Sequence, residues 1–101
     1  MLRPVGRVDE ATAAAFLERL SQEIHSAAED GTRLVVLGLA EISYMSSRGL
    51  RALTLAQREG GERDVRIVLA EPNDIMREIL AISRYDLVFP VFDTTDAAVS
   101  A

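Results

Sequence analysis

Two short apolar runs constrain the fold of this chain more than any other feature. They cover Arg33–Leu39 and Arg66–Leu69, and after its leading arginine neither run alternates apolar with polar residues. A strand with one solvated face alternates in polarity, whereas a strand covered on both faces is apolar throughout. The two runs therefore predict two interior strands of a sheet.

An amphipathic segment precedes the first of these strands. It predicts a helix from about Glu10 to Glu29. Asp9 is a suitable N-cap with Thr12 as the alternative, and Gly31 suits the C′ position just past the helix end. The apolar face that would pack on the sheet consists of Phe16, Leu17, Leu20, Ile24 and Ala27 or Ala28.

Two more helices follow the interior strands. The first is predicted to begin at Ser46 and to stop at Gly60-Gly61. The next has Pro72 near its first position, where proline is tolerated, and ends near Arg84. The apolar faces are Leu50, Leu53 and Ala56 or Gln57 in the former, and Ile75, Met76, Ile79, Leu80 and Ile82 in the latter.

The C-terminal part of the chain predicts shorter elements. Residues 87–89 and 91–92 have the pattern of short extended pieces. Asp93 or Thr94 is expected to cap a final short helix over Thr95–Ser100.

The order along the chain is therefore a strand followed by a helix, four times over. The first strand is a weak prediction over residues 2–8, where Pro4 marks a sheet edge. Ala40–Ser43 is predicted to be a connection. Such alternation predicts an α/β domain with a mixed, largely parallel sheet and about four flanking helices. We expect residues 1–101 to form one domain.

Composition excludes several function classes. The chain has 101 residues, of which 16 are acidic and 11 basic, all of them arginine, so its net charge is −5, and it has no cysteine. Without cysteine there are no disulfides, thiolate metal sites or cysteine nucleophiles. The acidic balance disfavours nucleic acid and anionic membranes, and no apolar run approaches the ~20 residues that cross a bilayer. The expectation is a small cytoplasmic domain with no nucleic-acid or membrane partner.

No residues have the pattern of a catalytic, cofactor-binding or metal site. His25 is the only histidine, so no second His or Cys shares a catalytic or metal-binding task with it. Glycine-rich phosphate motifs are absent. A receiver domain carries its phospho-accepting aspartate near the position of Gly38, so the glycine counts against a receiver domain. We therefore expect neither enzymatic activity nor a cofactor or metal.

The most informative segment is Tyr44–Leu50, where extended chain turns into a helix. One interpretation is structural: Ser46 is an N-cap that accepts a backbone N–H, and Ser47 is the next residue. The other interpretation uses the same geometry, because the N–H donors and partial positive charge of a helix start accommodate a phosphate on Ser47. Arg48 or Arg51 could supply a cationic partner. The residues alone leave both interpretations open.

Several stretches of the chain resemble the STAS family, the sulfate-transporter and anti-sigma-antagonist domain, and within it the single-domain anti-sigma factor antagonists. Gly6–Ala13 is similar to the family's approach to its first helix, and Leu34–Leu53 to its central strand, switch loop and following helix. Arg66–Ala70 and Pro72–Phe92 are similar to its later strand, helix and closing stretch. The resemblance implies a STAS fold in which the family's usual first strand, before Gly6, is missing or trimmed.

This resemblance implies a partner switch. The unmodified antagonist binds an anti-sigma factor that is also a serine kinase of the histidine-kinase-like ATPase fold, phosphorylation of a serine at the start of the switch helix releases it, and a serine phosphatase resets it. The family pattern there is Asp, the phosphorylated Ser, Ser or Thr, Gly and Leu. In this chain Ser46 stands in the Asp place, Ser47 in the acceptor place and Arg48 in the second Ser/Thr place. Gly49 and Leu50 match the pattern.

The two departures from the pattern affect the expected chemistry. Ser46 still caps a helix, but the missing carboxylate could slow phosphorylation. Arg48 could pair with the phosphate or with an acidic patch on the partner. The residues expected to bind the partner are Tyr44, Met45, Ser46, Arg48, Gly49, Arg51 and Thr54.

Two alternatives remain at this point. Tyr44 and Met45 could pack beneath the helix instead of contacting a partner. The chain could also be a non-switching STAS accessory subunit, for example of an ABC transporter ATPase, in which both serines are only structural.

Overall fold

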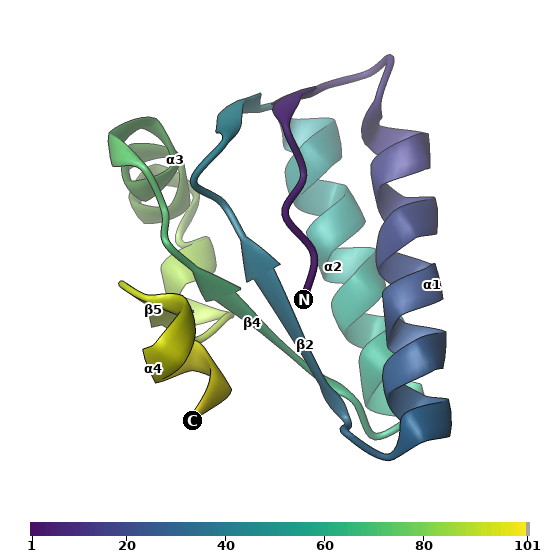
Figure 1. Ribbon diagram of the computed structural model, residues 1–101. Coiled ribbons are helices and arrows are strands. Elements are labelled where there is room, and N and C mark those ends of the chain that lie inside the picture. The colour runs from purple at the N-terminus through teal and green to yellow at the C-terminus, as the bar shows by residue number, and fades with distance from the viewer. Residues whose placement is uncertain (101) are drawn as a thin grey trace.

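The computed structural model describes residues 1–100, and its named strands pair only in parallel (Figure 1). The strands β2 (Leu34–Gly38), β4 (Arg66–Ala70) and β5 (Val91–Phe92) form one sheet in the order β2-β4-β5. The strands β1 (Gly6–Val8) and β3 (Ile42–Met45) form a second, two-stranded sheet. The parallel pairing agrees with the expectation from the alternating element order.

Helices cover both sides of these strands. Within the described residues they are α1 (Ala13–Asp30), α2 (Ser47–Glu62), α3 (Asp74–Ser83) and α4 (Thr95–Val99), with a 3-10 turn η1 (Tyr85–Leu87) after α3. The helices α1 and α2 lie side by side on one face of the central strands, and Met76 and Leu80 of α3 join the same core, whereas α4 packs on the opposite face (Figure 1). The predicted α/β class with about four flanking helices is confirmed.

The continuous apolar character of β2 has a direct cause in this layering. Val35 and Leu37 point into the main core beneath α1 and α2, whereas Val36 points to the opposite face. There it packs with Val68 of β4 and Ala98 of α4 in a smaller cluster. Because successive side chains of a strand point to opposite faces, a strand buried on both faces needs apolar residues at every position.

The start of α1 differs from the expectation. The helix begins at Ala13, with Thr12 and not Asp9 at the N-cap position. The Asp9 carboxylate accepts the backbone N–H of Ala11 at 3.0 Å and so shapes a turn before the helix. Gly31 has a φ of 81°, which confirms it as the left-handed residue that ends the helix.

The predicted stop of α2 at Gly60-Gly61 is wrong, because the helix continues to Glu62. Glycine at position 60 has a packing reason instead. A Cβ atom there would lie 2.7 Å from the carbonyl oxygen of Val65, where the chain folds back towards β4. This contact excludes a side chain without ending the helix.

Other local expectations also need correction. Ile42–Met45 forms β3, although the sequence pattern predicts a connection for part of this stretch. Pro72 lies outside α3, which has Asn73 as its N-cap and begins at Asp74. Residues 87–89 are not extended, because η1 ends at Leu87 and the short strand begins only at Val91.

Two members of the predicted apolar face of α3 are misplaced. Met76 and Leu80 are buried and Ile79 packs at the edge of the core, but Ile75 and Ile82 face solvent, with Ile82 76% exposed. The last helix, α4, agrees with the expectation, since the Thr94 side chain accepts the N–H of Ala97 at 3.1 Å and caps it.

Candidate functional site

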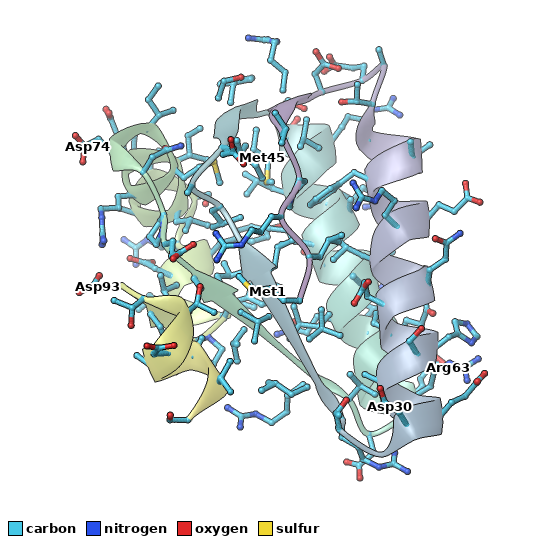
Figure 2. All side chains as sticks on the ribbon, in the orientation of Figure 1. Met1, Asp30, Met45, Arg63, Asp74 and Asp93 are labelled. Atoms are coloured by element: carbon cyan, nitrogen blue, oxygen red, sulfur yellow. The ribbon has the colours of Figure 1, made fainter. Side chains whose placement is uncertain are left out.

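The start of α2 lies where the carboxyl ends of β1 and β3 meet. These two strands are parallel, with Val8 opposite Met45 in the register. The N–H of Ser46 then donates to the carbonyl oxygen of Val8 at 2.8 Å, which ties the entry of the helix to the end of β1. Figure 2 shows Met45 close to this end of the molecule, far from Asp30 and Arg63 at the opposite end of the helical layer.

Ser46 is the N-cap of α2, as the structural interpretation expects. Its backbone is extended, with φ −81° and ψ 177°, and its Oγ accepts the N–H of Gly49 at 3.4 Å. Its carbonyl oxygen accepts the N–H of Leu50 at 2.9 Å. The side chain is only 9% exposed, so Ser46 orients the helix start from within the fold.

Ser47 is the first residue of α2, and its side chain is exposed. Within residues 1–100, the Ser47 hydroxyl makes no hydrogen bond to another protein group. Backbone N–H groups in the first turn of a helix lack intrahelical acceptors and carry partial positive charge. An exposed hydroxyl at this position can receive a phosphate without displacing a buried group.

Gly49 permits the close approach of α2 to the strands below it. A Cβ atom at this position would lie 2.5 Å from Met45 Cγ, 2.9 Å from Val8 Cγ1 and 3.1 Å from the carbonyl oxygen of Val8. Separations below 3.0 Å force a neighbour to move. Close packing inside the fold therefore accounts for this glycine.

Charged and aromatic side chains surround the start of α2. The Arg7 guanidinium lies 4.7 Å from the centre of the Tyr44 ring, and its Nε donates to the Asp9 carboxylate at 3.4 Å. The Ala11 N–H and then Arg7 stabilise the charged form of Asp9, so the pKa of Asp9 is lowered from its usual value. Arg7 thereby holds Tyr44 and Asp9 at the same edge as the helix start.

The residues that the sequence predicts to bind a partner divide into exposed and buried ones in the structure. Tyr44, Arg48 and Arg51 are exposed beside Ser47, with Tyr44 at 38% exposure. Met45 is only 2% exposed and packs beneath α2, so its expected place on the partner surface needs correction. The physical reason is that adjacent side chains of a strand point to opposite sides, so that Tyr44 of β3 faces outward while Met45 faces inward.

Gly49 is also buried, so it shapes the surface without forming part of it. Thr54 is half-buried, and its hydroxyl lies 2.8 Å from the Tyr85 hydroxyl in η1. This contact fixes α2 against the segment that follows α3. Thr54 therefore marks the boundary of the exposed surface around Ser47.

Asn73 is a positioning residue that the sequence interpretation missed. Its Oδ1 accepts the N–H of Met76 at 2.8 Å, and its Nδ2 donates to the carbonyl oxygens of Ala40 at 3.1 Å and Ile42 at 2.7 Å. One amide group thus caps α3 and holds the connection that leads into β3. Asparagine directly after Pro72 and before a charged first turn was a usable N-cap signal.

We expect Asn73→Ala to lower the free energy of unfolding by roughly 1–3 kcal/mol, because it removes a helix cap and leaves carbonyl groups without donors. Urea unfolding followed by circular dichroism measures this loss. Asn73→Asp keeps the cap but loses the amide donors, so it should also be destabilised. A wild-type stability for Asn73→Asp would show that the contacts to residues 40 and 42 contribute nothing.

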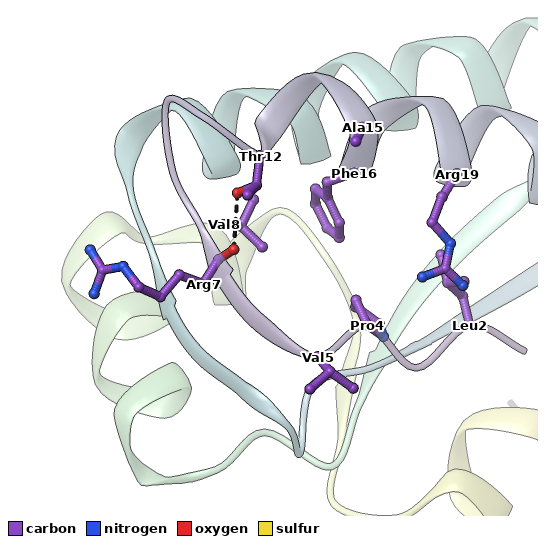
Figure 3. A pocket seen from close by; sticks show the side chains of 9 residues that line it. All are labelled: Leu2, Pro4, Val5, Arg7, Val8, Thr12, Ala15, Phe16 and Arg19. Carbon is purple, nitrogen blue, oxygen red and sulfur yellow. Dashed lines mark hydrogen bonds between the residues drawn. The ribbon is translucent and has the colours of Figure 1, made fainter.

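A small pocket lies between the N-terminal segment and α1, next to the site (Figure 3). Its volume is about 160 Å³, and Phe16 and Val8 are among the residues that line it. In Figure 3 the Arg7 side chain points away from the pocket, and Thr12 donates to the Arg7 carbonyl oxygen at 2.9 Å. Pockets for drug-sized ligands measure about 300–1,000 Å³. The volume is therefore small for such a ligand.

Metal-ligand clusters and membrane-spanning helices are both lacking in the described residues. In the part of the chain that the structure describes, no three His, Cys, Asp or Glu side chains are grouped so that they could hold a metal ion. None of the helices in residues 1–100 combines the length and apolar character needed to cross a membrane.

Comparison with known proteins connects these features to one family. The STAS domain family matches residues 1–98. An anti-sigma factor antagonist of Bordetella bronchiseptica, BtrV, is 34% identical over 88 residues, which are 87% of this chain and 76% of that protein.

Solved structures support the same fold. An anti-sigma factor antagonist from Thermotoga maritima superposes with a TM-score of 0.80 at 18% identity, covering 96% of this chain and 80% of the other. The antagonist SpoIIAA, in its unphosphorylated form, superposes with a TM-score of 0.75 at 17% identity, covering 98% and 84%. At these low identities the similarity establishes the fold alone.

Proposed function

The chain belongs to the STAS domain family, and from this premise we propose that it is an anti-sigma factor antagonist that exchanges partners through phosphorylation of Ser47. The observation that carries the proposal is the exposed Ser47 hydroxyl at the first residue of α2. The similarity to the anti-sigma factor antagonist of Bordetella supports the class of function. We further propose that residues 1–101 act as one STAS unit in the cytoplasm.

In this proposal the unmodified protein binds an anti-sigma factor that is also a serine kinase of the histidine-kinase-like ATPase fold. The Ser47 Oγ attacks the γ-phosphorus of ATP, the bond from that phosphorus to the ADP oxygen breaks, and the hydroxyl proton passes to the kinase or to solvent. The products are phosphoserine 47 and ADP. A serine phosphatase later hydrolyses the phosphoester and restores the binding form.

Electrostatics supports a switch without unfolding. A phosphate adds about −1.5 to −2 charges at neutral pH. At a helix N-terminus a negative charge is favourable by typically about 0.3–1 kcal/mol, so the monomer accommodates the phosphate on Ser47. A partner packed against the same surface would have to accommodate a dianion that was absent when the complex formed.

The proposed contact surface consists of exposed residues around the helix start. Tyr44, Arg48 and Arg51 lie beside Ser47 and present an aromatic ring and two cations. Aromatic and arginine side chains often contribute most of the binding free energy at interfaces. Ser46, Gly49 and Met45 hold this surface in place from below.

The test is a binding experiment with purified components. Each histidine-kinase-like anti-sigma factor of the same genome is titrated with the unmodified protein by isothermal calorimetry in the absence of ATP. The proposal expects saturable binding of one of them. If none binds, while the protein forms a stable complex with an ABC transporter ATPase, the accessory-subunit role replaces the proposal.

A further inference from the structure

A shallow groove runs between α1 and α2 next to the start of α2. Its volume is about 190 Å³, and Leu17 of α1 with Ala52 and Leu55 of α2 contribute apolar lining. Leu17 and Leu55 are half-buried, so part of each side chain faces solvent along the groove. The side chains of Arg48 and Arg51, which are exposed, line the same groove.

Polar contacts close the groove at its far end. One helical turn beyond Leu17, Ser21 donates to the Glu59 carboxylate at 2.7 Å. His25 lies 3.5 Å from the same carboxylate. The lining of the groove, which extends to Leu17 and Leu55, thus ends before this polar contact.

The charge of this region is opposite to that of the chain. The protein carries a net charge of −5, but the stretch from Ser47 to Arg58 contains three arginines and no acidic residue. Among residues 1–100, carboxylates lie within 4.0 Å of Arg3, Arg7 and Arg77, but none lies so close to Arg48 or Arg51. The groove therefore joins an apolar lining to two arginines without carboxylate partners in the described part of the chain.

We propose that this groove binds an acidic segment of the anti-sigma factor, which inserts an apolar side chain between α1 and α2 and pairs its carboxylates with Arg48 and Arg51. The inference rests on the function proposed above and extends its contact surface onto α1. The groove, at about 190 Å³, is smaller than the roughly 300–1,000 Å³ of small-molecule pockets, so its volume favours a single inserted side chain over a drug-sized ligand. Arginine and carboxylate form strong, directional pairs, so the two arginines favour an acidic segment over a neutral or basic one.

The same arginines connect the groove to the switch. Arg51 follows Ser47 by four residues, and side chains at this spacing are neighbours on a helix. A phosphate on Ser47 would form a charge-assisted pair with Arg51. Phosphorylation would then withdraw Arg51 from the acidic segment while it also adds negative charge beside it.

Arginine variants test the groove in the complex. Arg48→Gln and Arg51→Gln should each weaken binding of the anti-sigma factor by about tenfold, measured by isothermal calorimetry at fixed salt. Arg58→Gln is the matched control, because Arg58 has the same charge on the same helix but lies outside the groove lining. Its affinity should stay within about twofold of the wild type.

A second variant changes a residue on the α1 side of the groove. Ala14 is exposed and lines the groove, so Ala14→Glu places a carboxylate next to the two arginines at little cost to the helix. It should weaken binding, whereas Ala15→Glu, on the neighbouring position outside this groove, should not. The inference is overturned if Arg51→Gln binds like the wild type, or if Arg58→Gln loses affinity equally.

Failure of the proposed function gives a different result. If the wild-type protein binds no anti-sigma factor, the groove is tested with a fluorescein-labelled helical peptide that carries leucines flanked by glutamates. Fluorescence anisotropy should then give saturable binding that Arg51→Gln weakens and Arg58→Gln retains. Absence of binding, or equal binding of a peptide with lysines in place of the glutamates, would reject the groove as an acidic-segment site.

Discussion

Replacing Ser47 with aspartate weakens binding of the anti-sigma factor by at least about tenfold and leaves the fold intact. The expected loss corresponds to roughly 1.4 kcal/mol or more, because a carboxylate is placed in the contact surface beside Tyr44 and Arg48. The free energy of unfolding should stay equal or rise slightly, since a negative charge at the first helical residue is favourable. Calorimetry of binding and urea unfolding of the same variant separate the two effects.

Two controls distinguish charge at this position from charge in general. Ser47→Ala removes the acceptor without adding charge, and it should bind with near wild-type affinity. Ser26→Asp introduces the same charge on an exposed part of α1, towards the opposite end of the molecule from Ser47, and it should also bind normally. Unchanged affinity in a folded Ser47→Asp protein would count against a charge-based switch.

The second large effect is a change in the stability of the fold, and it concerns two glycines of α2. Gly49→Ala should lower the free energy of unfolding by roughly 1–3 kcal/mol, because its Cβ would lie 2.5 Å from Met45 Cγ and 2.9 Å from Val8 Cγ1. Gly61→Ala should be neutral or stabilising by up to about 1 kcal/mol, since a Cβ atom at this position would have no neighbouring atom within 4 Å and alanine favours helices. For a domain of about 100 residues, each kcal/mol shifts the Tm by about 4–8 °C.

Differential scanning calorimetry should therefore show a lower Tm for Gly49→Ala and an unchanged or higher Tm for Gly61→Ala. Gly49→Ala should also weaken partner binding, because moving the first turn of α2 away from Val8 displaces Ser47 and Arg48. A higher Tm for Gly49→Ala would mean that the close approach of α2 to β1 and β3 does not constrain this position.

The two interior strands could be predicted because their local pattern and their tertiary environment agree. Each residue of β2 from Val35 to Gly38 is buried, and the apolar run in the sequence reports this directly. The strand β3 was missed because its sequence places exposed Ser43 and Tyr44 between two buried residues. Its strand conformation depends on pairing with β1, a distant segment that local pattern does not reveal.

Glycine and apolar residues give wrong predictions of helix ends and of burial where tertiary packing determines the local structure. Gly60 has the pattern of a stop signal, but it fits a helix that passes close to the Val65 carbonyl oxygen. Leu87 belongs to an apolar stretch, yet it is 77% exposed in a 3-10 turn that follows the left-handed Arg84. Composition alone does not distinguish such exposed apolar residues from core residues.

The candidate site was partly predictable for a related reason. Two serines after an extended segment indicate a helix start, and Ser46 forms that cap. The burial of the residues around it could not be inferred, because the opposite orientations of Tyr44 and Met45 depend on the strand β3, which the sequence pattern did not predict. Asn73 was overlooked because its contacts to Ala40 and Ile42 join segments that are distant in sequence.

The most direct test of the central claim is phosphopeptide mapping combined with binding. The protein is incubated with the anti-sigma factor that binds it and with ATP, and the phosphorylated residue and the amount of remaining complex are measured by mass spectrometry and gel filtration. We expect phosphate on Ser47 and dissociation of the complex in proportion to its incorporation, with Ser47→Ala remaining unmodified and bound. Phosphate on another residue, or a complex that persists with Ser47 fully phosphorylated, would contradict this expectation.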